Sequence, residues 1–488
     1  MKGTRNAAGA ALVIVLALAV ARAEGATINV TTTNDENSSS PANLVCALRE
    51  AVIAANNNVA VGACPAGSPG LDTIVVPAGT YTLTIAGTGE DASETGDLDL
   101  KDTVTIQGAG TSATTLDGGA LDRVIEVLGG APATITGLTV RNGATEGIAN
   151  DSASGSTVLT TVSVQSNAGI GVMNRGVMRI DGSTIRGNAQ GGIWNDCCSA
   201  SIRISDVTVE NNTVTSSPFA AVFAWGPMTM DRSRIRNNTG VAGTAAVTTV
   251  STVSTISNTT IENNSQFGLI GACSGLSCYL NTLSLDRSTV SGNHAGGIYL
   301  LATDLDTTNS TISGNTGPGL QLVASYATLH HVTITENSGL AIDNGGYLYH
   351  GNDVKLSSSL IDGACATIAP NTTTSLGGNL ESPGNTCNLT ALGDQVNVAD
   401  PGLGPLAMNS GPTMTHLPSS TSPALDMALG TVPCPATDQR SIARPYGAAC
   451  DVGAVERSPS GCREGLEMAG LAPLTLGFAR RRRARSSP

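Results

Sequence analysis

The chain has 488 residues, enough for two or three domains, and 40% of them are hydrophobic, which is ample for a core. Only 3% are aromatic and 13% charged, while glycine occupies 58 positions, a composition that favours thin, regular packing layers. The net charge is −13, and it becomes −19 without residues 1–26 and 462–488, which hold nine of the 25 basic and three of the 38 acidic residues. This balance argues against nucleic-acid binding, and against a polyanionic partner unless a cation bridges it.

The first 23 residues have the features of a secretory signal peptide. Lys2 and Arg5 precede an apolar run over residues 10–21, and small residues flank Arg22 at a typical cleavage site. A transmembrane anchor is the alternative, but the run is shorter than the roughly 20 residues that span a bilayer. We therefore expect an exported protein, secreted or held at a cell surface.

A cap region is expected over residues 24–71. Its one helical pattern covers residues 46–56, with Leu48, Val52 and Ile53 on a single face. Alternating strand patterns with glycine turns follow at 72–83 and 104–110. A short amphipathic helix suits the apolar end of a solenoid, which has no neighbouring coil to cover it.

The middle of the chain repeats the phrase Ser/Thr-Ile/Val-x-x-Asn. Its final asparagines are separated by 21, 24, 26, 26, 29, 22 and 22 residues, and they are Asn167, Asn188, Asn212, Asn238, Asn264, Asn293, Asn315 and Asn337. β-branched strands at this period, without helical spacing, predict an all-β, right-handed parallel β-helix over residues 72–362. The asparagines are expected to form a turn ladder between coils.

Five positions after these asparagines lies a column of aliphatic residues that should point inward. The next residue of each strand should then point outward, which aligns Met173, Trp194, Ile270 and Tyr299 in one stripe. Exposed aromatics often hold sugar rings or partner surfaces, so this stripe is a candidate ligand face. The alternative is that a loop or the C-terminal region covers it.

A polysaccharide-cleaving enzyme would need paired carboxylates, which stacked coils could supply from one column. The candidates occupy turn positions or neighbouring strands, and they are Asp181, Asp231, Asp286, Asp304, Asp306 and His330. Serine and threonine interrupt the column, and arginine follows two of the acids, which favours turn capping over catalysis. This pattern therefore assigns no catalytic residue.

The densest acidic stretch runs from residue 90 to 102 and includes Glu90, Asp91, Asp97 and Asp99. Oxygen-rich loops with alternating aspartates suit Ca²⁺, so a calcium site is a hypothesis here. A solvated acidic turn is the alternative.

Eleven cysteines in an exported chain are expected to be mostly oxidised. Local spacing suggests the pairs Cys46/Cys64, Cys273/Cys278, Cys365/Cys387 and Cys434/Cys450, together with the adjacent Cys197 and Cys198, whose vicinal bridge would be strained. Cys462 is left over, ahead of a weak apolar stretch and an arginine cluster. Residues 457–488 therefore form either a sorting tail or a disordered basic tail.

Two segments resemble exported bacterial β-helix proteins. Cys46-Ala47-Leu48-Arg49-Glu50-Ala51 and the strand pattern after it resemble their CSLREA-type N-terminal region, although alanine stands in place of the usual serine. Asp438-Gln439-Arg440, Arg444-Pro445 and residues 450–456 resemble their choice-of-anchor Q-type region, which suggests an anchor-associated segment over 363–456. The resemblance implies a fold and a surface destination but no catalytic residues.

The expected function is thus a surface β-helix that presents its lateral face for adhesion, envelope structure or contact with glycans or envelope proteins, with membrane association only through the tail. The alternative is a polysaccharide lyase or glycoside hydrolase acting in the lateral groove. A monomer is expected, with Ca²⁺ as the one candidate cofactor.

Overall fold

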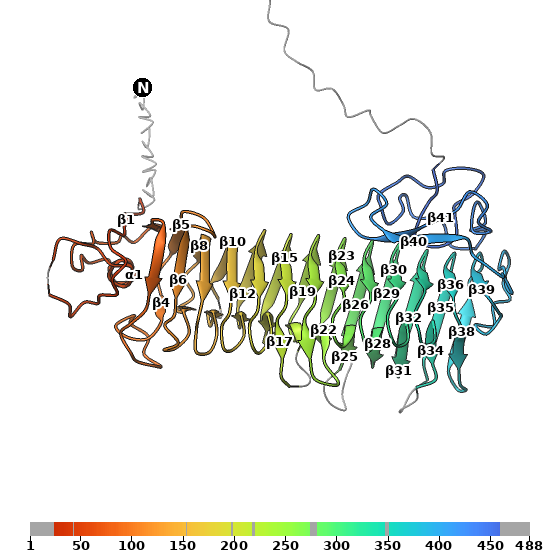
Figure 1. Cartoon of the computed structure of the whole chain (residues 1–488), viewed down its shortest axis with the longest axis horizontal. Helices are drawn as coiled ribbons and strands as arrows, with labels where there is room; N and C mark the ends of the chain where they lie inside the picture. The colour runs from red at the N-terminus through yellow and green to blue at the C-terminus, as the bar shows by residue number, and fades with distance from the viewer. Residues whose placement is uncertain are drawn as a thin grey trace, which may run out of the picture.

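The computed structural model of the chain describes residues 24–41, 43–152, 154–196, 199–216, 220–273, 281–346 and 351–458. These residues form a parallel β-solenoid with one helix, α1 (Leu48–Asn57), near the N-terminus (Figure 1). The predicted β-helix and its capping helix are therefore confirmed. The predicted signal peptide, the C-terminal tail with Cys462, and Cys197, Cys198 and Cys278 lie outside the described residues.

Each coil contributes strands to three faces. The first face is a 12-stranded parallel sheet among the described residues. Its strands are β4 (Leu98–Leu100), β7 (Ile125–Val127), β9 (Ile148–Asn150), β11 (Val172–Asn174), β14 (Ile193–Asn195), β18 (Ala220–Ala224), β22 (Ala245–Val250), β25 (Phe267–Ala272), β28 (Gly296–Leu301), β31 (Leu320–Val323), β34 (Ile342–Asn344) and β37 (Cys365–Thr367).

The second and third faces are joined in a 25-stranded sheet that bends once per coil. The second face holds β1 (Thr27–Asn29), β2 (Asp72–Val76), β5 (Val104–Gly108), the first halves of β8 (Ala133–Arg141) and β10 (Ser156–Gln165), β12 (Val177–Asp181), β15 (Ser201–Ser205), β19 (Met228–Asp231), β23 (Val253–Ser257), β26 (Asn281–Asp286), β29 (Thr303–Thr308), β32 (Tyr326–His330), β35 (Asp353–Ser357) and β38 (Thr372–Ser375).

The third face holds β3 (Gly79–Thr82), β6 (Thr114–Asp117), the second halves of β8 and β10, β13 (Thr184–Arg186), β16 (Thr208–Glu210), β20 (Arg234–Arg236), β24 (Thr260–Glu262), β27 (Thr289–Ser291), β30 (Thr311–Ser313), β33 (Thr333–Thr335), β36 (Leu360–Asp362) and β39 (Leu380–Ser382). Two short pairs complete the set, β17 (Thr213–Val214) with β21 (Thr239–Gly240) and β40 (Leu403–Ala407) with β41 (Thr415–Pro418). The solenoid thus starts earlier and ends later than the expected range of 72–362, because β1 pairs with β2 and strands continue to Ser382.

The asparagine ladder lies at the turn after the third face, as predicted. From Asn167 to Asn337, each Nδ2 group donates to the Oδ1 of the next asparagine at 2.8 to 3.0 Å. A second ladder, which the sequence pattern did not suggest, joins Asn150, Asn174 and Asn195, the last residues of three first-face strands. Buried amides bonded in this way hold adjacent coils in register.

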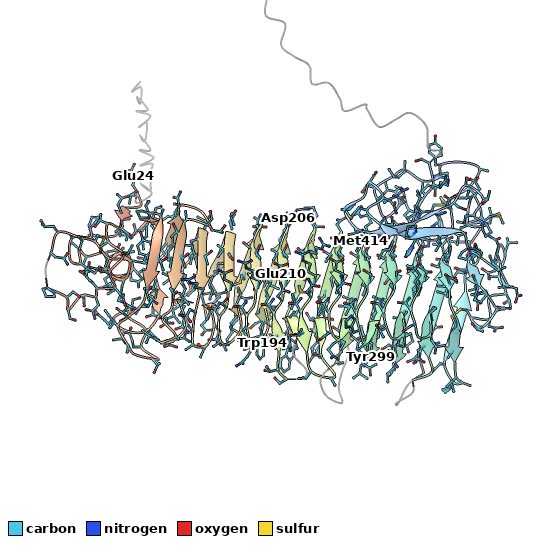
Figure 2. The ribbon with its side chains drawn as sticks, in the orientation of Figure 1. Glu24, Trp194, Asp206, Glu210, Tyr299 and Met414 are labelled. Atoms are coloured by element: carbon cyan, nitrogen blue, oxygen red, sulfur yellow. A yellow bond between two sulfur atoms is a disulfide. The ribbon has the colours of Figure 1, made fainter. Side chains whose placement is uncertain are left out.

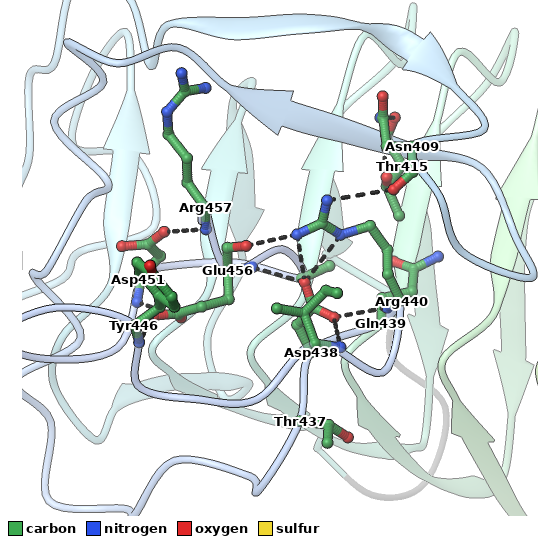
Figure 3. A network of polar contacts seen from close by, with 12 residues as sticks. Asn409, Thr415, Thr437, Asp438, Gln439, Arg440, Tyr446, Asp451, Glu456 and Arg457 are labelled. Atoms are coloured by element: carbon green, nitrogen blue, oxygen red, sulfur yellow. Dashed lines mark hydrogen bonds and ion pairs between the residues drawn. The ribbon is translucent and has the colours of Figure 1, made fainter. Parts of the chain in front are cut away.

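A C-terminal lobe, residues 403–457, packs on the side of the solenoid beside β27, β30 and β33 (Figure 1). Its interior is an ionic network (Figure 3). Arg440 donates twice to the Asp438 carboxylate, at 3.0 and 2.8 Å, and the buried Arg444 lies 3.0 Å from Glu456. Asp438, Arg440 and Arg444 belong to the segment that resembles the choice-of-anchor Q-type region, and they hold the lobe together from within.

Three of the predicted disulfides are present. Cys46–Cys64, Cys365–Cys387 and Cys434–Cys450 have Cα–Cα distances of 4.7, 4.9 and 6.5 Å. The first closes the cap region, where Arg49 of α1 is fully buried and donates to the carbonyls of Ser93, Gly96 and Asp97. No helix in the described part of the chain is long and apolar enough to cross a membrane.

Candidate functional site: a groove beside the C-terminal lobe

A groove of about 420 Å³ lies where the edge of the lobe meets the solenoid. We call it the lobe groove. The solenoid lines it with Asp206, Thr208, Arg232, Arg234, Asn258 and Thr260, and the lobe lines it with Met408, Pro412 and Met414. Figure 2 shows Asp206 and Met414 on the side of the solenoid that carries the lobe.

The polar side chains of the lobe groove are fixed in place by one another. Arg232 donates to both carboxylate oxygens of Asp206, at 2.9 and 2.8 Å, while both side chains remain about half exposed. Asn258 donates to the Asp231 carboxylate at 2.8 Å. The wall therefore offers hydroxyl, amide, guanidinium and carboxylate groups to a ligand, with thioether groups opposite.

The turns between the second and third faces explain why these residues project. Asp206, Arg232 and Asn258 each adopt a left-handed backbone conformation, with φ of 56°, 45° and 48°. This conformation bends the sheet and directs the side chain away from the core. The strand register places Asp206, Arg232 and Asn258 at the same position of successive coils, so they stack in one column along the groove.

The predicted column of turn acids is present in the strand register. Asp181 pairs with Ser205, which pairs with Asp231, then Ser257, Asp286, Thr308 and His330. Asp181 is ion-paired with Arg179, and Asp231 with Arg232. Burial acts to raise the pKa of Asp231, but hydrogen bonds from Asn258 and Ser257 outweigh it and lower that pKa. These two aspartates thus have structural partners.

Asp286 and Asp306 form the one pair of predicted catalytic acids with contrasting surroundings. Burial raises the pKa of Asp286, with a further contribution from the negative charge of Asp306, although Arg287 lies 3.1 Å away. Asp306 is exposed on the neighbouring strand, as is Asp304. Asp286 adjoins the lobe groove, because its backbone carbonyl accepts a hydrogen bond from the backbone N–H of Asn258 at 3.1 Å.

His330 lies in the same column but contacts the C-terminal lobe. Its Nδ1 atom is 2.8 Å from the Ser357 hydroxyl, and its Nε2 atom is 3.0 Å from the carbonyl of Pro433. Burial lowers its pKa and so favours the neutral ring. A docking contact is therefore its observed role.

The predicted stripe on the first face is in register, but much of it is covered. Strand pairing aligns Met173 with Trp194, and Ile270 with Tyr299. Met173 and Ile270 are only 4% and 8% exposed, while Trp194 and Tyr299 are half-buried. Figure 2 shows both aromatic residues on the side away from Asp206. Any ligand contact on this stripe therefore falls to its two aromatic residues, Trp194 and Tyr299.

Of the four predicted calcium ligands, two converge. Asp91 and Asp99 lie together with Glu126, a residue that the sequence pattern missed because it lies outside the acidic stretch. Glu90 instead accepts hydrogen bonds from the amides of Ala92 and Thr95. Asp97 is paired with Arg123 at 2.9 Å.

Comparison with known proteins agrees with the solenoid. A family model described as "Right handed beta helix region" matches residues 120–239 and 220–386. No curated protein matches the chain.

Three solved structures illustrate the likeness, which at these identities and TM-scores extends to the fold alone. The A-module of mannuronan C-5 epimerase AlgE6 from Azotobacter vinelandii is 15% identical, with 72% of this chain and 100% of that chain covered and a TM-score of 0.44. Pectate lyase Pel9A is 13% identical, with 79% and 88% covered and a TM-score of 0.36. The catalytic unit of the GH87 alpha-1,3-glucanase from Streptomyces thermodiastaticus is 13% identical, with 74% and 72% covered and a TM-score of 0.33.

Proposed function

The chain belongs to the family of proteins with a right handed beta helix region. We propose that this protein uses its lateral surface to bind a polysaccharide, and that the polysaccharide lies in the lobe groove. The observation that carries this proposal is the groove itself. It combines a volume typical of ligand sites with preorganised planar polar groups. Such groups match the hydroxyl pattern of sugar rings, and the methionines supply apolar contact.

The charge of the groove favours a neutral polysaccharide. Arg232 is paired with Asp206 and Asp231, and Arg234 is paired with Glu262, so neither guanidinium offers an uncompensated positive charge. Residues 27–461 carry a net charge of −19. A polyanionic glycan would therefore meet net repulsion, whereas a neutral one would not.

Cleavage of the bound polysaccharide is a second candidate function. The observation that favours it is the pair formed by Asp286, whose backbone carbonyl accepts the backbone amide of the groove residue Asn258, and Asp306 on the neighbouring strand. The raised pKa of Asp286 suits a general acid, and the exposed Asp306 suits a base or nucleophile, since glycosidases pair carboxyl groups in contrasting environments. A polysaccharide lyase or glycoside hydrolase is the corresponding activity.

Affinity electrophoresis of the full chain against neutral and acidic polysaccharides tests the binding proposal. Arg232→Asn removes the guanidinium while keeping a residue that tolerates the left-handed turn. We expect at least about tenfold weaker binding to a neutral polysaccharide, because the substitution removes more than one hydrogen bond between the guanidinium and the ligand. Arg179→Asn, which removes an equally exposed, ion-paired arginine away from the groove, is the matched control.

The proposal fails if no neutral polysaccharide binds or if Arg232→Asn binds like the unaltered chain. Incubation of the same polysaccharides with the protein, followed by assays for new reducing ends and unsaturated products, tests cleavage. Product formation that disappears in Asp286→Asn and Asp306→Asn would establish it. If the polysaccharide binds but no product forms, the lateral surface would serve adhesion or envelope structure. That function is consistent with the predicted export to the cell surface.

A further inference from the structure

We propose that Asp91, Asp99 and Glu126 bind a Ca²⁺ ion at the N-terminal end of the solenoid. One carboxylate oxygen from each residue lies within 4.8 Å of the other two. Asp99 and Glu126 are direct partners in the pairing of β4 with β7, so the sheet itself holds them side by side. Asp91 comes from the loop before β4 and is exposed, which leaves the cluster open to the ion and to water.

Burial makes this cluster different from a solvated acidic turn. Asp99 is 0% exposed and Glu126 is 3% exposed. The Oδ2 atom of Asp99 accepts the Ser93 amide at 2.7 Å, but its Oδ1 atom has no hydrogen-bonding partner in the described part of the chain. A buried carboxylate oxygen without a partner is costly, and a metal ion supplies the missing interaction.

The basic residues near the cluster are paired with groups other than Asp99. Arg123 pairs with Asp97 as well as with Glu126, and Arg175 pairs with Asp151 and Asp196 at 2.6 and 3.0 Å. The Lys101 ammonium donates to the backbone carbonyl of Asp91. Asp99 therefore has no counterion among the described residues.

The burial of Asp99 and Glu126 also disfavours their charged forms while no ion is bound. Burial, reinforced by the charge of Asp97, raises the pKa of Asp99 to about 7. Burial and a contact with Asp151 raise the pKa of Glu126 to about 8, although Arg123 opposes the change. A divalent cation would favour the ionised form of both and expel the protons they hold near neutral pH.

The donor set favours Ca²⁺ over other common metal ions. All three side chains offer oxygen, which suits hard cations and not Zn²⁺ or Cu²⁺. Ca²⁺ tolerates an irregular shell completed by water and carbonyl groups, whereas Mg²⁺ demands near-octahedral geometry that a pleated sheet edge and one loop do not impose.

A bound ion would stabilise the contact between the cap and the first coils, at the opposite end of the solenoid from the lobe (Figure 1). The loop that carries Asp91 also supplies the carbonyls of Ser93 and Gly96 that bind the buried Arg49 of α1. An ion bonded to Asp91, Asp99 and Glu126 would tie this loop to β4 and β7 and so hold the cap on the solenoid.

Isothermal titration of the purified full chain with CaCl₂ at pH 7, after treatment with chelator, tests the site. We expect saturable binding with a stoichiometry of about one, and a heat that varies with the ionisation enthalpy of the buffer because about one proton is released. Thermal unfolding in Ca²⁺ should occur about 2–3 °C higher than in chelator. MgCl₂ should give a smaller shift.

Asp99→Asn and Glu126→Gln should each abolish the calcium-dependent shift and the proton release. Both substitutions remove charge from a repulsive cluster, so the variants are expected to fold and melt no lower than the unaltered chain in chelator. Asp343→Asn, in the same outward column at the far end of the first face, is the matched control and should retain the shift. Equal melting in Ca²⁺ and chelator, or a full response in Asp99→Asn and Glu126→Gln, would overturn the proposal.

Discussion

The hydroxyl of Thr311 donates to Oε1 of Gln439 at 2.6 Å, although the two residues are 128 positions apart in the chain. Gln439 is fully buried between the solenoid and the lobe. Its Nε2 group lies 3.0 Å from the Thr289 hydroxyl and 2.9 Å from the Thr413 hydroxyl. One amide thus joins two coils to the lobe and helps to set the wall of the lobe groove.

We expect Gln439→Ala to weaken this docking. The substitution leaves three buried hydroxyl groups with a lost partner, which should reduce the free energy of unfolding by about 2–4 kcal/mol. Urea unfolding and the rate of proteolysis within residues 403–457 measure the effect. Gln165→Ala, at a surface hydrogen bond with Arg186, should change either quantity little, and equal effects of the two substitutions would contradict the assigned role.

The asparagine ladder makes a second prediction at Asn238. Its Oδ1 atom accepts the amide of Asn212 and its Nδ2 group donates to Asn264, so Asn238→Ala should cost about 2–4 kcal/mol in equilibrium unfolding. Asn237→Gly is the control, because this exposed residue has a φ of 53° that glycine adopts without strain. A cost at Asn237 as large as that at Asn238 would show that the ladder is not the cause.

The ladder also shows what the sequence made predictable. A repeat imposes register, so the positions of Asn238, the inward column and the alignment of Met173 with Trp194 all followed from counting residues. Glu126 was missed because only the stacking of β7 on β4 brings it to Asp99, 27 positions earlier. The lobe groove was missed for a related reason. Its lobe wall has no repeat, and contacts such as Thr311 to Gln439 fix its position.

The stability of the chain in chelator should depend on pH through Asp99 and Glu126. Burial raises their pKa values to about 7 and about 8, from ordinary values of 3.8 and 4.5. The folded chain therefore holds these protons more tightly than the unfolded chain. The protonated Asp99 and Glu126 side chains therefore contribute to the free energy of unfolding. This contribution is fully present below about pH 4 and is lost as the pH rises through 7 and 8.

The melting temperature in chelator, followed from pH 5 to pH 8.5, measures this dependence. Other groups titrate in the same range, including His330, so the informative quantity is the difference from the double variant Asp99→Asn/Glu126→Gln. We expect the unaltered chain to lose stability relative to the variant as the pH rises. A constant difference over this range would contradict the raised pKa values.

The aromatic residues of the first face give a separate prediction. Trp194 packs edge-to-face on Phe223 with ring centroids 5.6 Å apart, and Tyr299 lies 5.5 Å from Phe267. Since both are half-buried, Trp194→Ala/Tyr299→Ala should lower the free energy of unfolding by about 2–5 kcal/mol and leave polysaccharide binding unchanged. Loss of binding in a folded double variant would instead assign ligand contact to this stripe.

The central claim, that a neutral polysaccharide lies in the lobe groove, is tested most directly by hydrogen exchange of the full chain with and without a saturating oligosaccharide from the polysaccharide it binds. The account predicts slower exchange in peptides that cover residues 206–208, 232–234 and 258–260 of the solenoid and 408–414 of the lobe. Peptides of the first face around Trp194 should exchange at an unchanged rate. Protection confined to the first face, with none at the lobe groove, would contradict the claim.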